Sequence, residues 1–155
     1  MRSFASIEEF VAAKGESLGP TEWVEIDQTR IDTFADATGD HQWIHVDPGR
    51  AAEGPFGATI AHGFLTLSLL PSLLSRLYVV EGVSMGINYG LNKVRFPAPV
   101  PVGKRVRAHC TLTDALHRDG FVESVVTTVI EVEGPEGTAA EKPACVVESV
   151  GRFYA

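Results

Sequence analysis

The sequence of 155 residues has little positive charge: 13 Lys and Arg residues against 20 Asp and Glu give a formal net charge of −7. Proteins that bind nucleic acids or anionic membrane surfaces need a basic face, so this balance argues against both kinds of partner. Cysteine is equally scarce, with only Cys110 and Cys145. Their spacing matches neither a metal site nor a redox pair, and we expect two small buried residues in a reducing cytoplasm.

Long hydrophobic runs are also missing. The most apolar region, near residues 64–80, is interrupted by Thr, Ser, Pro and Arg, and falls short of the roughly 18 apolar residues that a membrane span requires. The first ten residues mix acidic and apolar side chains and lack the apolar core of a secretory signal. With 45% hydrophobic and 21% charged residues, the composition predicts one ordinary cytoplasmic domain over residues 1–155.

The first third of the chain carries helix signals. A capping box at Ser6 predicts a short helix through Ala13, and the alternation in residues 22–26 predicts a strand. Asp27 caps a second predicted helix, which leads to Gly39 and Asp40. An Asp-Pro pair at residues 47–48 predicts a further short helix that ends at Gly54.

The remainder of the chain predicts one helix and then a sheet. Residues 62–77 place leucine on almost every side of a helix, so this helix must be enclosed by other elements. Pro71 removes one of its hydrogen bonds and should bend it. Segments 83–96, 105–112, 121–132 and 144–153 read as long antiparallel strands between turn signals. The fold class is therefore α+β, with an antiparallel sheet covering one helix.

Asp40 and His45 are the first candidates for chemistry. A carboxylate and a histidine that titrates near pH 7 are the usual general acid and base. Five residues apart on a straight helix, the two would point about 140° away from each other, so a loop must bring them together. From the residues alone, an alternative stays open, in which Asp40 caps a turn and His45 is a half-buried structural residue.

Two segments carry a resemblance to a known family. GDHQWIH at residues 39–45 and AHGFLTLS at residues 61–68 resemble the hydratase motif of the MaoC-like, (R)-specific enoyl-CoA hydratases and 3-hydroxyacyl-thioester dehydratases. The similarity in pattern runs from about residue 22 to the C-terminus. It implies a hot dog fold, in which a curved antiparallel sheet wraps one long central helix, and a reversible syn addition of water to trans-2-enoyl thioesters in fatty-acid metabolism.

The resemblance also implies roles for single residues. By position, Asp40 and His45 match the catalytic pair, Gly63 matches the backbone donor to the thioester oxyanion, and Ser68 matches the helix serine. The sequence departs from the family at two positions, where Gln42 and Trp43 stand in place of the usual asparagine and proline. These departures affect the shape of the loop and the acyl pocket more than the chemistry.

Several neighbouring residues are weaker candidates. The position of His62, next to Gly63, favours a structural role at the helix start over a role as a third proton carrier. The serine at 68 bonds either the Asp40 loop or its own helix backbone. Lys93, Arg95 and Arg105 belong to the one basic concentration in this acidic chain, together with Lys104 and Arg107, and could contact the phosphates of CoA. Ordinary solvated strand edges would explain the same basic residues.

The resemblance further implies partners. We expect an acyl-CoA or acyl-carrier-protein thioester as substrate, no cofactor and no metal, and a two-fold homodimer with a shared ten-stranded sheet. Two other function classes stay open. A hot dog thioesterase would hydrolyse the thioester without needing the Asp40 and His45 pair, and a non-catalytic acyl-binding module would need only the apolar pocket. The pattern leaves acyl chain length, the carrier and the pathway undecided.

Overall fold

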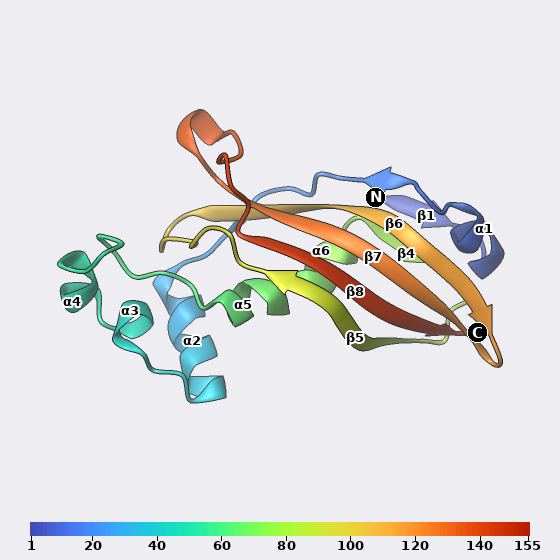
Figure 1. The fold of residues 1–155 in the computed structure, drawn as a ribbon, viewed down its shortest axis with the longest axis horizontal. Helices are drawn as coiled ribbons and strands as arrows, with labels where there is room; N and C mark the ends of the chain where they lie inside the picture. The colour runs from blue at the N-terminus through green and yellow to red at the C-terminus, as the bar shows by residue number, and fades with distance from the viewer.

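The computed structural model describes all 155 residues, and four long antiparallel strands dominate it. They are β5 (Met85–Arg95), β6 (Arg105–Arg118), β7 (Phe121–Val132) and β8 (Cys145–Tyr154). Their order across the sheet is β6, β7, β8 and β5, and they extend side by side in Figure 1. The short strands β2 (Ser17–Leu18) and β3 (Val24–Glu25) pair with the outer edge of β6. The predicted antiparallel sheet is confirmed, although the strand expected at residues 22–26 is only two residues long.

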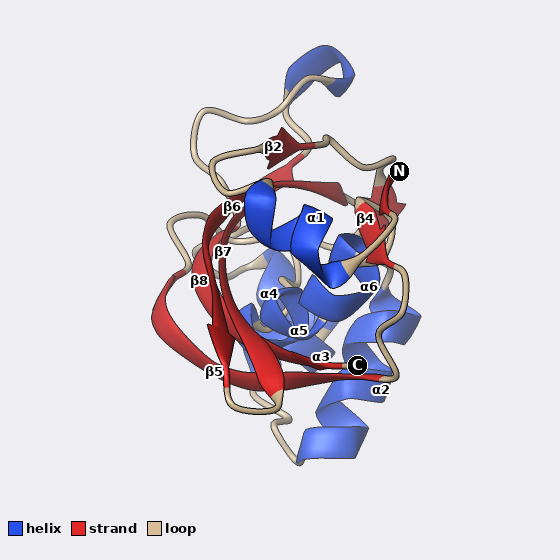
Figure 2. Cartoon of the chain, turned by 90° about the vertical axis from the view of Figure 1, so that its right-hand side faces the viewer, coloured by secondary structure: helices blue, strands red, loops and turns tan.

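The sheet curves around the central helical segment, as the end-on view in Figure 2 shows. Along β7 every second residue is buried, which is the period expected of a strand with one face on the core. Val126 and Ile130 on this face are 3% and 0% exposed. The cysteines at 110 and 145 are free thiols buried in the same sheet, as their sequence context predicted.

The central helical segment differs from the single helix expected over residues 62–77. It consists of α5 (Gly63–Ser68) and α6 (Leu70–Leu74), which meet at Leu69. Leu69 keeps helical backbone angles, and its N–H is shared between the carbonyls of Leu65 and Thr66 at 3.2 and 3.3 Å. The interruption lies here because Pro71, two residues later, has no N–H with which to continue the hydrogen-bond ladder.

The N-terminal residues close one end of the sheet. Helix α1 (Ile7–Ala12) is capped by Ser6, whose side chain accepts a bond from the Glu9 N–H. Strand β1 (Arg2–Phe4) pairs in parallel with β4 (Tyr78–Val80), directly after the central segment. Phe4 and Phe10, each 1% exposed, form a second core with Tyr78 and residues of β6 and β7. No pattern in the sequence indicated this parallel pair.

Three helices gather at the other end of the sheet (Figure 1). They are α2 (Gln28–Thr38), α3 (Trp43–Val46) and α4 (Pro48–Ala52). The helices α2 and α4 were predicted from their caps, and Asp27 and Asp47 each accept the expected bond from the backbone. A single 3₁₀ turn, η1 (Pro135–Gly137), lies between β7 and β8. None of the helices combines the length and the apolar character needed to cross a bilayer.

Candidate active site

The end of α2 delivers Asp40 to the start of α5. Gly39 terminates α2 with φ 78°, a left-handed conformation that glycine adopts without steric cost. Asp40 follows as an exposed residue, and the backbone carbonyl of Asp40 accepts a hydrogen bond of 2.9 Å from His62 Nε2. His62, which precedes α5, therefore fixes the loop that carries the Asp40 carboxylate.

His45 lies on α3, a single helical turn that the sequence did not predict. It is 6% exposed, and its Nδ1 donates to the carbonyl of Ile60 at 2.6 Å. This bond assigns the proton of the neutral ring to Nδ1, so Nε2 keeps a free lone pair. Burial lowers the pKa of His45 below its usual value, and neighbouring His62 acts in the same direction. His45 is therefore held neutral and able to accept a proton.

His62 completes a compact cluster. Its ring stacks on that of His45 with centroids 3.8 Å apart and an angle of 23° between the planes. His62 is 2% exposed, and its Nδ1 has no hydrogen-bond partner in the protein. One polar side-chain atom from each of Asp40, His45 and His62 lies within 4.8 Å of the other two. Two hydrogen bonds of about 2.8 Å to one water molecule would span such a gap.

The cluster contains residue types that bind metals, but its geometry is poor for a metal ion. Lone pairs of imidazole lie in the ring plane, and the rings of His45 and His62 stack face to face. An ion placed between them would sit out of both planes, contrary to the in-line bonds that zinc and related ions make to histidine. The arrangement suits hydrogen bonding to one small molecule better than coordination.

Gly63 begins α5 beside this cluster. Its backbone angles lie outside the left-handed region, and a Cβ atom at this position would meet the ring of Phe96 at 3.0–3.2 Å. The Gly63 N–H is one of the first donors of the helix, which have no acceptor within it. The glycine thus has a packing role against Phe96 and also leaves its N–H open to a ligand.

A partly buried network that the sequence did not indicate supports the turn of His45. Gln28 on α2 donates from Nε2 to the His45 carbonyl at 2.8 Å, and its Oε1 accepts a bond of 2.5 Å from the Thr59 hydroxyl. Thr59 is 1% exposed. This network ties α2, α3 and the segment before α5 together, and so fixes the position of the imidazole.

We expect Gln28→Leu to lower turnover by about fivefold to tenfold, the effect of losing a bond worth about 1 kcal/mol. Because His45 would be misplaced rather than removed, kcat should fall more than KM rises. Steady-state kinetics measure this split, with Thr33→Val as the control, since the Thr33 hydroxyl on the same helix bonds only the backbone of α2. A Gln28→Leu protein with unchanged kcat would contradict a positioning role.

Trp43 occupies the position where the family has proline. Its ring lies under the guanidinium of Arg50, at 4.4 Å, and is packed so closely on Gly54 that a Cβ there would come within 2.9 Å of the ring. The preceding Gln42 makes no side-chain bond to the helix turn that it begins. The Trp43 ring therefore joins α3 to α4 and the turn that follows it, through Arg50 and Gly54.

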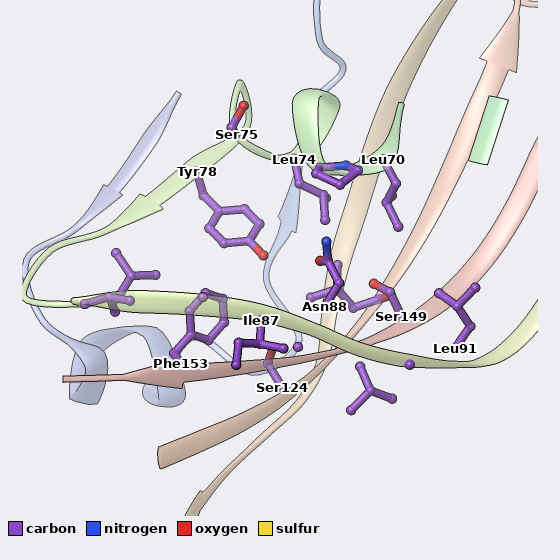
Figure 3. A pocket seen from close by; sticks show the side chains of 18 of the residues that line it. Leu70, Leu74, Ser75, Tyr78, Ile87, Asn88, Leu91, Ser124, Ser149 and Phe153 are labelled. Carbon is purple, nitrogen blue, oxygen red and sulfur yellow. The ribbon is translucent and has the colours of Figure 1, made fainter. Parts of the chain in front are cut away.

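A cavity of about 820 Å³ lies beside α5 and α6. It is bounded by those helices and by β4, β5 and β8, with mostly apolar walls (Figure 3). Ser68 lines it but donates its hydroxyl to the Phe64 carbonyl at 2.7 Å. Of the two interpretations open for Ser68, the structure shows the bond to its own helix and none to the Asp40 loop.

The basic residues do not form one cluster. Arg105 makes two hydrogen bonds to Glu133, which follows β7, and these bonds raise its pKa. The neighbouring Arg107 is paired with Glu131. By contrast, Lys93 and Arg95 are exposed on β5 and make no ion pair. The guanidinium of Arg105 is thus already bonded to Glu133, whereas Lys93, Arg95 and Lys104 make no ion pair within the protein.

Comparisons with known proteins agree on one family. A family model described as "MaoC like domain" matches residues 9–134. The chain is 58% identical over 156 residues to 3-hydroxyacyl-thioester dehydratase Z of Mycobacterium tuberculosis, with 100% of each chain covered. It is 52% identical over 120 residues to nodulation protein N of Rhizobium leguminosarum, covering 76% of this chain and 73% of that protein. Among solved structures, the (R)-hydratase from A. caviae involved in PHA biosynthesis superposes with a TM-score of 0.67 and 28% identity, covering 89% of this chain and 94% of that one.

Proposed function

Because the chain belongs to the MaoC-like dehydratase family, we propose that it is an (R)-specific enoyl-CoA hydratase and (R)-3-hydroxyacyl-thioester dehydratase. The structural likeness and the sheet wrapped around α5 and α6 confirm the α+β hot dog fold expected from the motif. The observation that carries the proposal is the cluster of Asp40, His45 and His62, which lies directly before the free N–H of Gly63 at the start of α5. This reaction needs Asp40, His45 and that N–H.

Asp40 and His45 act as a pair, in which His45 transfers the protons and Asp40 orients the water. In hydration, a water molecule bound between the two side chains attacks Cβ of the enoyl thioester, and His45 Nε2 takes the proton that the water loses. The carboxylate of Asp40 accepts the second hydrogen bond of the water and orients its oxygen. The imidazolium then returns one proton to Cα on the same face, which balances the reaction and gives syn addition. Dehydration follows the same steps in reverse.

The start of α5 stabilises the charge that develops in between. Attack at Cβ moves an electron pair onto the thioester oxygen, and the N–H of Gly63 donates to that oxyanion. The partial positive charge at the start of the helical segment adds to this stabilisation. No cofactor is needed, because the thioester itself acidifies the α-proton and the protein supplies both the base and the oxyanion donor.

The acyl chain and the carrier occupy different surfaces. The apolar cavity starts at Leu67, about 6 Å along the helix axis from Gly63, and takes the acyl chain. Lys93 and Arg95 lie on β5, whose end contacts the start of α5 through Phe96. These two cations are placed to bind the phosphates of CoA or of a carrier-protein prosthetic group.

A homodimer follows from the free edge of β5. All but one residue of β5 is exposed, and four of these are large and apolar: Met85, Ile87, Tyr89 and Leu91. A long unpaired edge of this kind is stable when it pairs with another strand. Each chain contributes five strand positions, since β2 and β3 share the edge of β6, so two copies joined at β5 give the expected ten-stranded sheet.

The direct test of the reaction is hydration of crotonyl-CoA, followed by loss of enoyl absorbance and by chiral analysis of the product. We expect the (R)-3-hydroxybutyryl thioester, because the family includes an (R)-hydratase of similar structure, and syn addition, because the bound water and His45 stand on one face of the substrate. Release of free thiol instead would identify a thioesterase. Binding without any turnover would identify an acyl-binding module, and an (S) product would place the reaction outside this mechanism.

The pH dependence gives a second test. His45 acts in its neutral form, and burial lowers its pKa below the ordinary 6.5. As pH falls, the base is therefore protonated later than an exposed histidine would be, and kcat/KM should decline only below about pH 6.5. A pH–rate profile measured with crotonyl-CoA checks this. An acidic limb centred above 6.5 would mean that a different group controls the rate.

A further inference from the structure

The apolar cavity contains polar groups that a plain alkyl chain would leave without partners. Most of its lining is hydrophobic, yet Ser124 on β7 faces it with a side chain that is 1% exposed and makes no hydrogen bond within the protein. The opposite residue on β8 is Gly151, where a Cβ atom would lie 3.3 Å from Ser124 Oγ. The glycine thus leaves the serine hydroxyl open to the cavity.

Tyr78 brings a second hydroxyl to the same cavity. Its ring is held by stacking on Phe10, with centroids 5.6 Å apart, and by an edge contact with Phe4. The hydroxyl points into the cavity toward Asn88 (Figure 3) and has no partner in the protein. Burial raises the pKa of Tyr78 well above its usual value, so the phenol stays protonated and can donate a hydrogen bond.

The polar groups lie in the part of the cavity far from the reacting carbons. Tyr78 follows α6, and the end of α6 at Leu74 lies about 16 Å along the helical segment from Gly63. The cavity has no charged residue in its lining. A carboxylate at the end of an acyl chain would therefore leave water without finding a counter-charge, whereas a neutral oxygen would find donors and acceptors.

From this arrangement we infer that the preferred substrates carry an uncharged oxygen, as a hydroxyl or keto group, on the acyl chain remote from the thioester. Ser124, Tyr78 and Asn88 bind this oxygen. A plain methyl end would displace water from the two hydroxyls without replacing its hydrogen bonds, and so lose affinity. The inference rests on the proposed function, because it places the thioester at Gly63 and the acyl chain in the cavity.

The test measures binding of saturated thioesters, which the enzyme cannot hydrate. Octanoyl-, decanoyl- and dodecanoyl-CoA are titrated by calorimetry beside their ω-hydroxy, (ω−1)-keto and ω-carboxy counterparts. The three chain lengths place the oxygen at different depths in the cavity. At one chain length at least, the wild type should bind the hydroxy or keto form about three- to tenfold more tightly than the plain chain. The ω-carboxy form should bind more weakly than either.

Variants assign the effect to the cavity. Ser124→Ala and Tyr78→Phe should each reduce the preference for the oxygenated chain and leave plain chains bound as well or better. Ser75→Ala is the matched control, since Ser75 lines the same cavity but donates its hydroxyl to the Ser72 carbonyl. The preference should survive in this control.

Two results would overturn the inference: a wild type that prefers plain chains at every length, or a preference that persists in both variants. Tighter binding of the ω-carboxy form would overturn the neutral-oxygen requirement. Crotonyl-CoA turnover of the same preparation separates this failure from that of the proposed function. An active hydratase without the preference contradicts only the inference, whereas an inactive protein contradicts the function.

Discussion

Asp40→Asn and His45→Gln are each expected to lower the hydration rate by at least about 10²-fold, the low end of what general acid–base groups contribute. The asparagine side chain would keep the size of the aspartate but lose the charge that orients water, and the glutamine side chain has no basic nitrogen. The backbone carbonyl of Asp40, which binds His62, is unchanged by the first substitution. The loss should therefore appear in turnover more than in folding.

Matched controls lie close by in the chain. His41 and Asp36 are exposed and bond each other at 2.9 Å, outside the catalytic cluster. His41→Gln and Asp36→Asn make the same chemical changes there and should keep near-normal rates. Melting temperatures of all four variants show whether folding is intact. Near-normal turnover in a folded Asp40→Asn or His45→Gln protein would remove the paired-residue mechanism.

Gly63→Val should reduce turnover by about 10²-fold or more, because the valine side chain would obstruct approach of the thioester carbonyl to the backbone N–H, a donor worth about 3 kcal/mol. The geometry adds a second effect. The new Cβ would lie 3.0 Å from the ring of Phe96, so the ring must move or the helix start must shift. Rate, melting temperature and oligomeric state therefore have to be measured together.

A double variant separates the two effects. Phe96→Leu makes room beside the helix start, so Gly63→Ala combined with Phe96→Leu relieves the steric contact while a side chain still stands at position 63. If the carbonyl of the substrate needs that space, the double variant stays slow. Recovery of the wild-type rate would show that packing against Phe96 was the main reason for the glycine. A folded Gly63→Val protein with unchanged turnover would mean that the oxyanion donor lies elsewhere.

The sequence predicted those parts of the fold that depend on local periodicity and on caps. The alternation in β6 and β7, the caps of α2 and α4, and the interruption of the helical segment near Pro71 all come from interactions within a few residues. The turn α3 was missed because four residues are too few to show a helical period. The pairing of β1 with β4 was missed because no local signal connects residues so far apart in the chain.

The site was predictable only as a set of residue types. Spacing and resemblance nominated Asp40, His45 and Gly63, and the structure brings Asp40 and His45 together with His62, the residue before Gly63. The stacking of His62 on His45 and the support from Gln28 depend on how α2 packs on the loop, which the pattern does not contain. For the basic residues, the sequence suggested an availability that the structure limits. Arg105 looked available in sequence, but its partner Glu133 stands at the end of a neighbouring strand.

The pairing of β1 with β4 has a consequence for the order of folding. Arg2 pairs with Tyr78, 76 residues further along the chain, so β1 has no partner until the central segment has been made. The hairpin of β6 and β7, by contrast, closes over a two-residue turn and can form early. Phe4 and Phe10 stay uncovered in the interval, and such transiently exposed apolar surface promotes aggregation. Pulsed hydrogen exchange during refolding should show the amides of β7 protected before the amide of Phe4.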